Sequence, residues 1–177
     1  MAIIRQIAQL GQPVLREAAG NITNPTDPAV QALIDDMLVT VADANGVGIA
    51  APQVFESLSL FIVASSPNPR YPNAPQMEPT AMINPEILWR SEDKEKGWEG
   101  CLSIPGLHGL VPRHRWIGVR YLTREGEMRE VEFEDFLARV FQHEFDHLHG
   151  IVFIDRLEST QDLITEKEYL RSLRNHA

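Results

Sequence analysis

Cysteine is nearly absent from this sequence: Cys101 is the only one among 177 residues. A single thiol cannot form an intramolecular disulfide, and such sparing use of cysteine favours a reducing compartment over an oxidising one. Cys101 must therefore be a packing residue, a reactive thiol or a metal ligand. We expect a cytoplasmic protein.

Long apolar runs are missing as well. No stretch reaches the ~18 apolar residues of a membrane span, and the N-terminal segment has no apolar core behind a basic end that would mark a secretory signal. We therefore expect no contact with a membrane. The length, together with a hydrophobic fraction of 44%, fits a single globular domain over residues 1–177. A chain of this size buries about 68–70% of its unfolded surface.

Positive charge is scarce. Sixteen Lys and Arg residues stand against 25 Asp and Glu residues, which gives a net charge of −9. Because nucleic acids and anionic membranes attract clustered cations, this balance argues against direct DNA binding and favours small neutral substrates.

Three segments are predicted to be helical. Apolar residues that recur every three or four positions predict a helix over 28–44, for which Thr26 or Asp27 can serve as the cap. The same spacing predicts a helix over 136–149, and a third helix is expected over 161–174.

Between these helices, short runs of β-branched and aromatic residues predict strands. They lie at 58–63, 80–84, 87–91, 116–122 and 128–133. Five prolines between positions 67 and 79 make a continuous strand impossible there. Helices and strands without a regular β-α-β alternation predict an α+β fold with antiparallel or mixed sheets.

Residues 143–147 read HEFDH, an HExxH arrangement on the second predicted helix. His143 and His147 are about one helical turn apart and point the same way, so one divalent metal can bridge them. Glu144 lies beside the first ligand without ligating, where a general base must be to accept a proton from a water at the metal. A pattern with only three fixed positions also arises by chance.

A catalytic metal needs a third protein ligand. His149 is on a different helix face from His147, and His176 is at the chain terminus, so both are poorly placed. Cys101 is the better candidate because Gly100 frees the backbone just before the thiol. The alternative is a buried cysteine that only packs.

A third segment, residues 46–53, reads GVGIAAPQ and is rich in small residues. Another backbone could approach it closely. In isolation, a glycine turn that enters a strand explains it better. Gln53 has a role only if its amide faces a reacting carbonyl.

Together, GVGIAAPQ (46–53), EGCLS (99–103) and QHEFDH (142–147) resemble, in order and spacing, the three signature motifs of peptide deformylases. Residues 11–16 and 148–150 are also similar, so the resemblance covers at least residues 11–150. It implies an α+β fold in which antiparallel strands pack around a central HExxH helix. It further implies hydrolysis of the N-formyl group from the formyl-methionine of nascent polypeptides, with release of formate.

The resemblance also implies a metal site. Cys101, His143 and His147 would hold the ion, usually Fe(II), for which Zn(II), Ni(II) or Co(II) can substitute. Two neutral imidazoles and a thiolate leave a divalent ion with a formal charge of +1, so it is a milder Lewis acid than one held by three histidines. Such a metal depends on an adjacent base, the role that the resemblance gives to Glu144.

The remaining implied roles concern the substrate. The Gln53 side-chain amide and the Leu102 backbone N–H would stabilise the oxyanion. The backbone of the substrate would pair with Val47, Gly48 and Gly100. The first substrate side chain is expected in an apolar pocket formed by Val47, Phe136, Val140 and the ring of His143. One departure from the family is His108, at a position where members often carry arginine.

Two other functions fit part of the pattern. A metallopeptidase would use the same HExxH pair but would not need Cys101. A catalytically silent module with a structural metal would need neither Glu144 nor Gln53. Contact with the ribosome is a further family-level expectation, to which the balanced charges of the C-terminal stretch add little.

Overall fold

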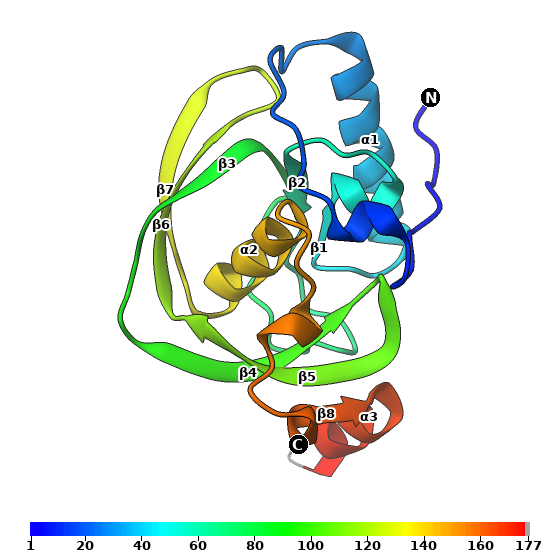
Figure 1. Ribbon diagram of the computed structural model, residues 1–177, viewed down its shortest axis with the longest axis vertical. Coiled ribbons are helices and arrows are strands. Elements are labelled where there is room, and N and C mark those ends of the chain that lie inside the picture. Colours follow the sequence, from blue (N-terminus) through cyan, green and yellow to red (C-terminus); the bar gives the residue numbers. More distant parts are fainter. Residues whose placement is uncertain (176–177) are drawn as a thin grey trace.

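The computed structural model describes residues 1–175 of the chain, which contain three α-helices and eight strands (Figure 1). The helices are α1 (Pro28–Asp43), α2 (Asp135–His147) and α3 (Glu166–Asn175). The strands are β1 (Gly48–Ala50), β2 (Leu60–Val63), β3 (Thr80–Arg90), β4 (Lys94–Cys101), β5 (Ile104–His114), β6 (Trp116–Leu122), β7 (Met128–Glu134) and β8 (Leu163–Thr165). Short 3₁₀ turns lie at Pro13–Arg16, Ala51–Val54, Phe153–Arg156 and Thr160–Asp162. No helix within residues 1–175 is long and apolar enough to cross a bilayer.

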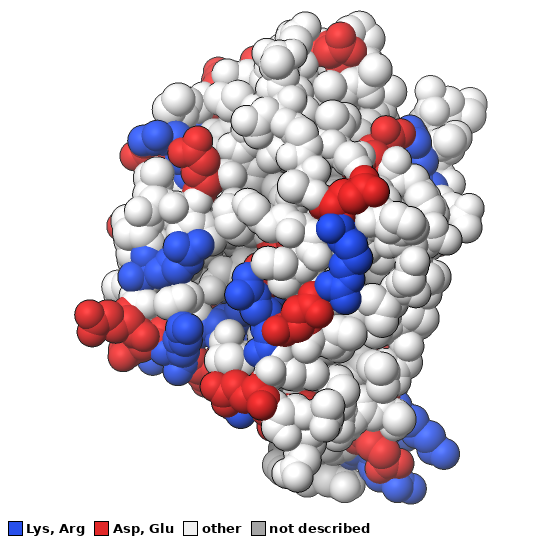
Figure 2. Space-filling view, viewed as in Figure 1, with Lys and Arg blue, Asp and Glu red and all other residues white. Residues whose placement is uncertain are grey.

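The strands form two sheets. The larger has the order β1-β2-β3-β6-β7 and the smaller has the order β4-β5-β8. Hydrogen-bonded neighbours in both sheets run antiparallel. The predicted α+β class is therefore confirmed. Figure 2 shows acidic and basic side chains interspersed over the viewed face, so the negative charge is not gathered into one patch there.

α2 lies in the middle of the molecule, with the strands curving around it (Figure 1). On its apolar side, Phe141 is fully buried and meets Phe61 of β2 edge-on, with ring centroids 5.0 Å apart. Such an aromatic pair adds about 0.5–1.5 kcal/mol to the burial of the rings themselves. The other side of α2 carries the three polar residues of the HExxH motif, which are also buried. This central position of the helix is the predicted one.

Two core clusters share the short strands β1 and β2. Residues of β2 alternate between the faces: Leu60 and Ile62 pack in the cluster with α1, whereas Phe61 and Val63 pack in the cluster with α2. Because both faces are covered, the strand is apolar throughout. α1 begins where predicted, with the Asp27 carboxylate accepting a hydrogen bond from the N–H of Ala29 at 2.8 Å.

The two strands predicted at 80–84 and 87–91 are one strand, β3. The prediction of two strands is wrong, although Pro85, which lies between them, cannot donate a ladder hydrogen bond. A shift of register between Ile83 and Glu86 accommodates the proline, so that pairing with β6 resumes beyond it.

The β4–β5 hairpin was not predicted, because glycine and proline interrupt the alternating pattern that identifies a strand. The C-terminal helix is also shorter than the predicted 161–174. Its first residues belong instead to a 3₁₀ turn and to β8, which pairs with Leu107–Gly109 of β5. Pairing with a neighbouring strand overrides helix propensity there.

Candidate metal centre

Cys101, His143 and His147 lie together, and one ligand atom from each falls within 4.8 Å of the others. The Cys101 Sγ is 3.4 Å from the Nε2 of His147. The two histidines come from consecutive turns of α2, and the cysteine ends β4. One thiolate and two imidazoles are a donor set that suits Fe(II) or Zn(II), so the residues present fit a divalent metal.

A local irregularity of the β4–β5 hairpin precedes the thiol. Gly100 pairs with His108, but Cys101 pairs with Ile104, so the register shifts between the two neighbours. Such a shift bends a strand and re-aims the side chain that follows. The shift thus falls directly before Cys101, the metal-ligand candidate of this strand.

The orientation of His143 is set by Glu99 of β4. The Nδ1 of His143 is 2.9 Å from the Glu99 carboxylate, which leaves Nε2 to face the other two ligands. Arg113 donates two hydrogen bonds to the same carboxylate, at 2.9 and 3.0 Å, and Arg139 donates a third at 3.0 Å. Burial alone raises the pKa of Glu99, but Arg113 and His143 hold it well below its usual range. Glu99 therefore stays ionised.

The same network includes a second carboxylate, on α2 one turn beyond His143. Arg113 also donates to Asp146 at 2.6 Å, and Arg156 donates to both oxygens of Asp146, at 2.7 and 3.0 Å. Asp146 is a variable position of the HExxH motif, yet it is buried and doubly paired. The network thus holds α2 against the sheet that carries Cys101.

His147 is held neutral by its surroundings. Burial, followed by the proximity of His143 and of the Arg113 guanidinium, places the pKa of His147 well below its usual value. A neutral imidazole is the form that binds a metal. Its Nδ1 is buried without a hydrogen-bond partner in residues 1–175.

Glu144 is buried beside these residues, and burial raises its pKa to about 7. Its Oε2 also has no hydrogen-bond partner within the described chain. The carboxylate fits against β1 only because residue 48 is glycine, since a Cβ there would lie 2.5 Å from Oε1 of Glu144. This contact is a physical reason for the glycine at position 48 of the GVGIAAPQ segment.

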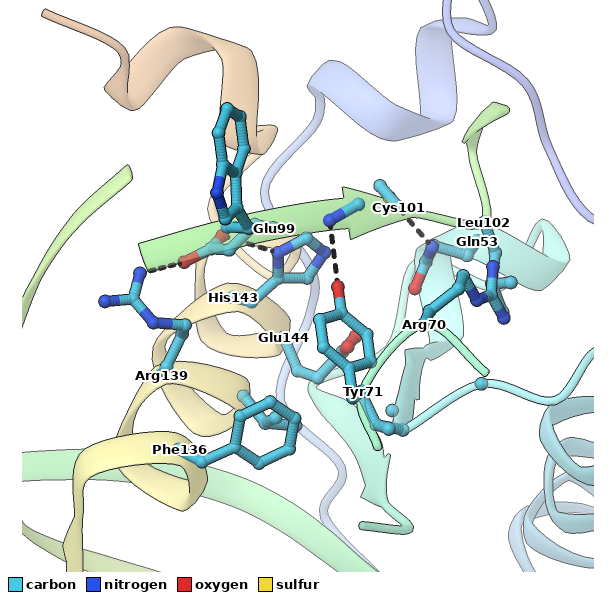
Figure 3. Close-up of a pocket in the computed structure, with 16 residues that line it drawn as sticks. Gln53, Arg70, Tyr71, Glu99, Cys101, Leu102, Phe136, Arg139, His143 and Glu144 are labelled. Atoms are coloured by element: carbon cyan, nitrogen blue, oxygen red, sulfur yellow. Dashed lines mark hydrogen bonds and ion pairs between the residues drawn. The ribbon is translucent and has the colours of Figure 1, made fainter. Parts of the chain in front are cut away.

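Gln53 follows β1, and its side-chain amide points toward Cys101. Its Oε1 accepts a hydrogen bond from the N–H of Ala50 at 2.8 Å. Its Nε2 donates to the Ser103 hydroxyl at 3.1 Å and approaches the Cys101 Sγ at 3.5 Å. The accepted bond fixes which end of the amide is the donor end, and that end faces the thiol (Figure 3).

A cavity opens beside these groups (Figure 3). Its lining includes the predicted residues Val47, Gly48, Gln53, Gly100, Cys101, Leu102, Phe136, Val140, His143 and Glu144. It also includes five residues for which no role was predicted: Arg70, Tyr71, Trp98, Glu99 and Arg139. The Tyr71 hydroxyl accepts a hydrogen bond from the N–H of Gly100 at 3.0 Å, and the Tyr71 ring packs on Phe136. Arg70 and Tyr71 come from the proline-rich loop, which has no periodicity that could have identified them.

The other histidines considered from the sequence lie outside this group. His108 is 2% exposed and stacks on Tyr169 of α3 with ring centroids 4.2 Å apart. Burial lowers its pKa, so it is a neutral ring rather than a replacement for the cation of an arginine. His149 is exposed, with Nδ1 2.8 Å from the carbonyl of Phe145. His176 is outside the described residues.

Comparison with known proteins finds matches over most of the chain. The polypeptide deformylase family matches residues 4–162. "Peptide deformylase 2" of Nostoc sp. is 60% identical over 163 residues, which are 92% of this chain and 91% of that protein. "Peptide deformylase 2" of Shewanella oneidensis is 44% identical over 162 residues, covering 92% and 89%. Among solved structures, a class I type b peptide deformylase from Acinetobacter baumannii bound to Met-Ala-Ser superposes with a TM-score of 0.86 at 45% identity, over 89% of this chain and all of that one.

Proposed function

The chain belongs to the polypeptide deformylase family and is a hydrolase that removes the N-formyl group from polypeptide N-termini, and on this premise we propose which of its residues carry out the reaction. The observation that carries the proposal is the convergence of Cys101, His143 and His147 beside the buried carboxylate of Glu144. We propose a single catalytic domain that acts in the cytoplasm, where its one thiol stays reduced.

Cys101, His143 and His147 would hold a metal ion, and we propose Fe(II), with Zn(II), Ni(II) or Co(II) as substitutes. When bound, the ion would act as a Lewis acid and lower the pKa of water. Glu99 keeps the His143 ring turned toward the site through its 2.9 Å contact with Nδ1. Its ionised carboxylate also makes that ring a stronger ligand.

Glu144 is the proposed acid and base. As the attacking water forms a bond to the formyl carbon, the Glu144 carboxylate accepts its proton. The same group then passes the proton to the amine nitrogen as the carbon–nitrogen bond breaks, so formate and a free N-terminus leave. Its Oε2, which is buried and has no hydrogen-bond partner among residues 1–175, is available for this exchange.

Gln53 and the backbone N–H of Leu102 are the proposed donors to the formyl oxygen. Negative charge develops on that oxygen during attack, and a fixed donor there contributes about 2.7–4 kcal/mol in other acyl-transfer enzymes. The bond from Ala50 to the Gln53 Oε1 fixes the amide before substrate arrives. Leu102 follows Cys101 in the turn between β4 and β5 and also lines the cavity.

The substrate is proposed to be an N-formylmethionyl peptide whose backbone pairs with Val47, Gly48 and Gly100. Its first side chain would occupy the apolar part of the cavity, next to Val47, Phe136 and Val140. A flexible thioether fits such a pocket. The Acinetobacter baumannii relative binds Met-Ala-Ser, a peptide that begins with methionine. Ribosome contact remains a prediction.

The test is release of formate from formyl-Met-Ala-Ser by the purified protein, with acetyl-Met-Ala-Ser as the matched substrate. We expect formate from the first peptide and slow or no release of acetate from the second. Cys101→Ala should lose both bound metal and formate release. Full metal occupancy and full activity in that variant would show that the third ligand is another residue.

A further inference from the structure

Two of the three tryptophans are exposed on the larger sheet, away from the catalytic cavity. Trp89 of β3 is 41% exposed and Trp116 of β6 is 51% exposed. Together with Glu132 and Glu134 of β7 they border a hollow of about 350 Å³. A large apolar side chain left in water costs free energy that a binding partner can recover.

A β-bulge places Trp89 on this face. Ile87 faces Val119 of β6, but Trp89 faces Gly118, so Leu88 is an extra residue without an opposite partner. In a regular ladder Leu88 would face Gly118, and Trp89 would face Ile117, which is fully buried. Because a one-residue shift moves a side chain to the other face, the bulge turns the Trp89 indole away from the core.

The glycine opposite Trp89 makes room for its ring. A Cβ on residue 118 would lie 2.0 Å from Nε1 of Trp89, closer than any real contact. The indole therefore rests directly on the β6 backbone, which only glycine permits. An exposed ring held in this way loses little conformational entropy when a ligand binds to it.

Two carboxylates flank the indoles. Glu134 is opposite Trp116 and Glu132 is opposite Gly118, so both share the outer face with the tryptophans. Neither glutamate forms an ion pair with a residue of the described chain. Farther along the same face, Arg120 is already paired with Glu130 at 2.6 Å. Within residues 1–175, the two carboxylates beside the indoles are therefore left without a paired cation.

We propose that Trp89, Trp116, Glu132 and Glu134 form a docking platform for a Lys- and Arg-rich segment of a partner protein. Guanidinium and ammonium groups bind the faces of indole rings, and carboxylates beside the rings pair with the same cations. Arginine suits the site better because its planar group stacks and donates in a fixed fork.

The charge of the platform excludes the other obvious occupants. An anionic membrane or a nucleic acid would be repelled by Glu132 and Glu134. A second copy of this chain, placed symmetrically on the platform, would bring four unpaired carboxylates together at a cost in free energy. The basic segment is the occupant that satisfies both the rings and the charges.

The probe is a fluorescently labelled peptide of alternating Arg and Gly, with Lys–Gly and Glu–Gly peptides for comparison, titrated by anisotropy at low and high salt. We expect the Arg peptide to bind better than the Lys peptide, more weakly as salt rises, and the Glu peptide not to bind. Trp116→Ala should weaken binding roughly two- to fivefold. The double change Glu132→Gln with Glu134→Gln should weaken it roughly three- to tenfold.

Glu125→Gln is the matched control, because Glu125 is an exposed carboxylate in the turn at the other end of the β6–β7 hairpin. It should bind the Arg peptide as the unchanged protein does. Every variant should release formate from a short formyl peptide at the normal rate, which shows that the fold is intact. Equal affinity of the Arg peptide for the unchanged protein and for the double variant would overturn the proposal. So would a dimer in sedimentation that Trp116→Ala converts to a monomer, since the occupant would then be a second copy.

Discussion

The carboxylate of Glu99 contacts Nδ1 of His143 at 2.9 Å, and Glu99 is only two residues from Cys101 in β4. One strand thus supplies one proposed metal ligand and orients another. The distance between the sheet and the helix, on which the geometry of the site depends, is fixed by this contact before any metal binds.

Replacing Glu99 with glutamine should weaken metal binding about 10- to 100-fold, because the ring of His143 loses its anionic partner. The metal-free protein should also lose free energy of unfolding, on the order of 3 kcal/mol, since the buried Arg113 loses one of its two carboxylates. Competition with a chromogenic chelator and thermal unfolding measure the two effects. Glu95→Gln, in the exposed part of the same strand, is the control and should change neither.

Gly48→Ala should lower kcat by about 100-fold while metal content stays the same, because the added methyl group displaces the Glu144 carboxylate and not the ligands. Gly20→Ala is the matched control, since its methyl group would meet the Ser57 carbonyl at an ordinary 3.6 Å. Steady-state kinetics measures kcat, and elemental analysis measures the metal content. An equal loss in both variants would mean that the effect is a general loss of stability.

Glu144→Gln should keep its metal and lose about 10²- to 10⁴-fold in kcat, because an amide of the same shape cannot accept the proton of the attacking water. The measurement is formate release together with metal stoichiometry. A near-normal rate with full metal would show that Glu144 is not the base.

Val140→Asp should lower kcat/KM for formyl-Met peptides relative to formyl-Ala peptides, because a charged group would enter the pocket proposed for the methionine side chain. Val39→Asp, at an exposed position of α1, is a control for the added charge. An unchanged preference for methionine in Val140→Asp would place that side chain elsewhere in the cavity.

The N-terminal segment should detach from α1 in acid. Burial raises the pKa of Asp36, but the N–H of Ile3 and the Arg5 guanidinium, each at 2.8 Å, together bring it below the usual value. The stabilisation is therefore complete above the ordinary aspartate pKa and is lost as the pH falls through the lowered one. Hydrogen exchange of the Ile3 amide, measured as a function of pH, reports this change. Asp36→Asn is the test variant, and Asp43→Asn, at the exposed end of α1, is its control.

The motifs led to the site because the residues within each motif are close in sequence and chemically unusual. The HExxH spacing placed His143, Glu144 and His147 on one side of a helix, and a single cysteine left few candidates for a third ligand. Arg113 could not be found in this way. Its partners Glu99 and Asp146 are 14 and 33 residues away, and only the pairing of β4 with β5 and the packing of α2 bring them together.

The fold was predicted best where the apolar residues of a segment recur at a regular spacing. α2 and β6 have clear periodicity, and their bounds differ little from the predicted ones. β4 and β5 owe their structure to each other and to the helix behind them, so their own sequences carry little of it. Pro85 shows the same limit, because a bulge that depends on β6 lets the strand continue past it.

The buried position of Arg113 also bears on how the chain folds. Its guanidinium cannot leave water at acceptable cost until both Glu99 and Asp146 are in place. The β4–β5 hairpin and α2 must therefore come together in one cooperative step, in which contacts distant in sequence form at once. Such long-range closure is slow. Once the ion pairs of Arg113 have formed, they also oppose the separate fraying of α2. Any local opening of the helix would leave a buried charge without its partner.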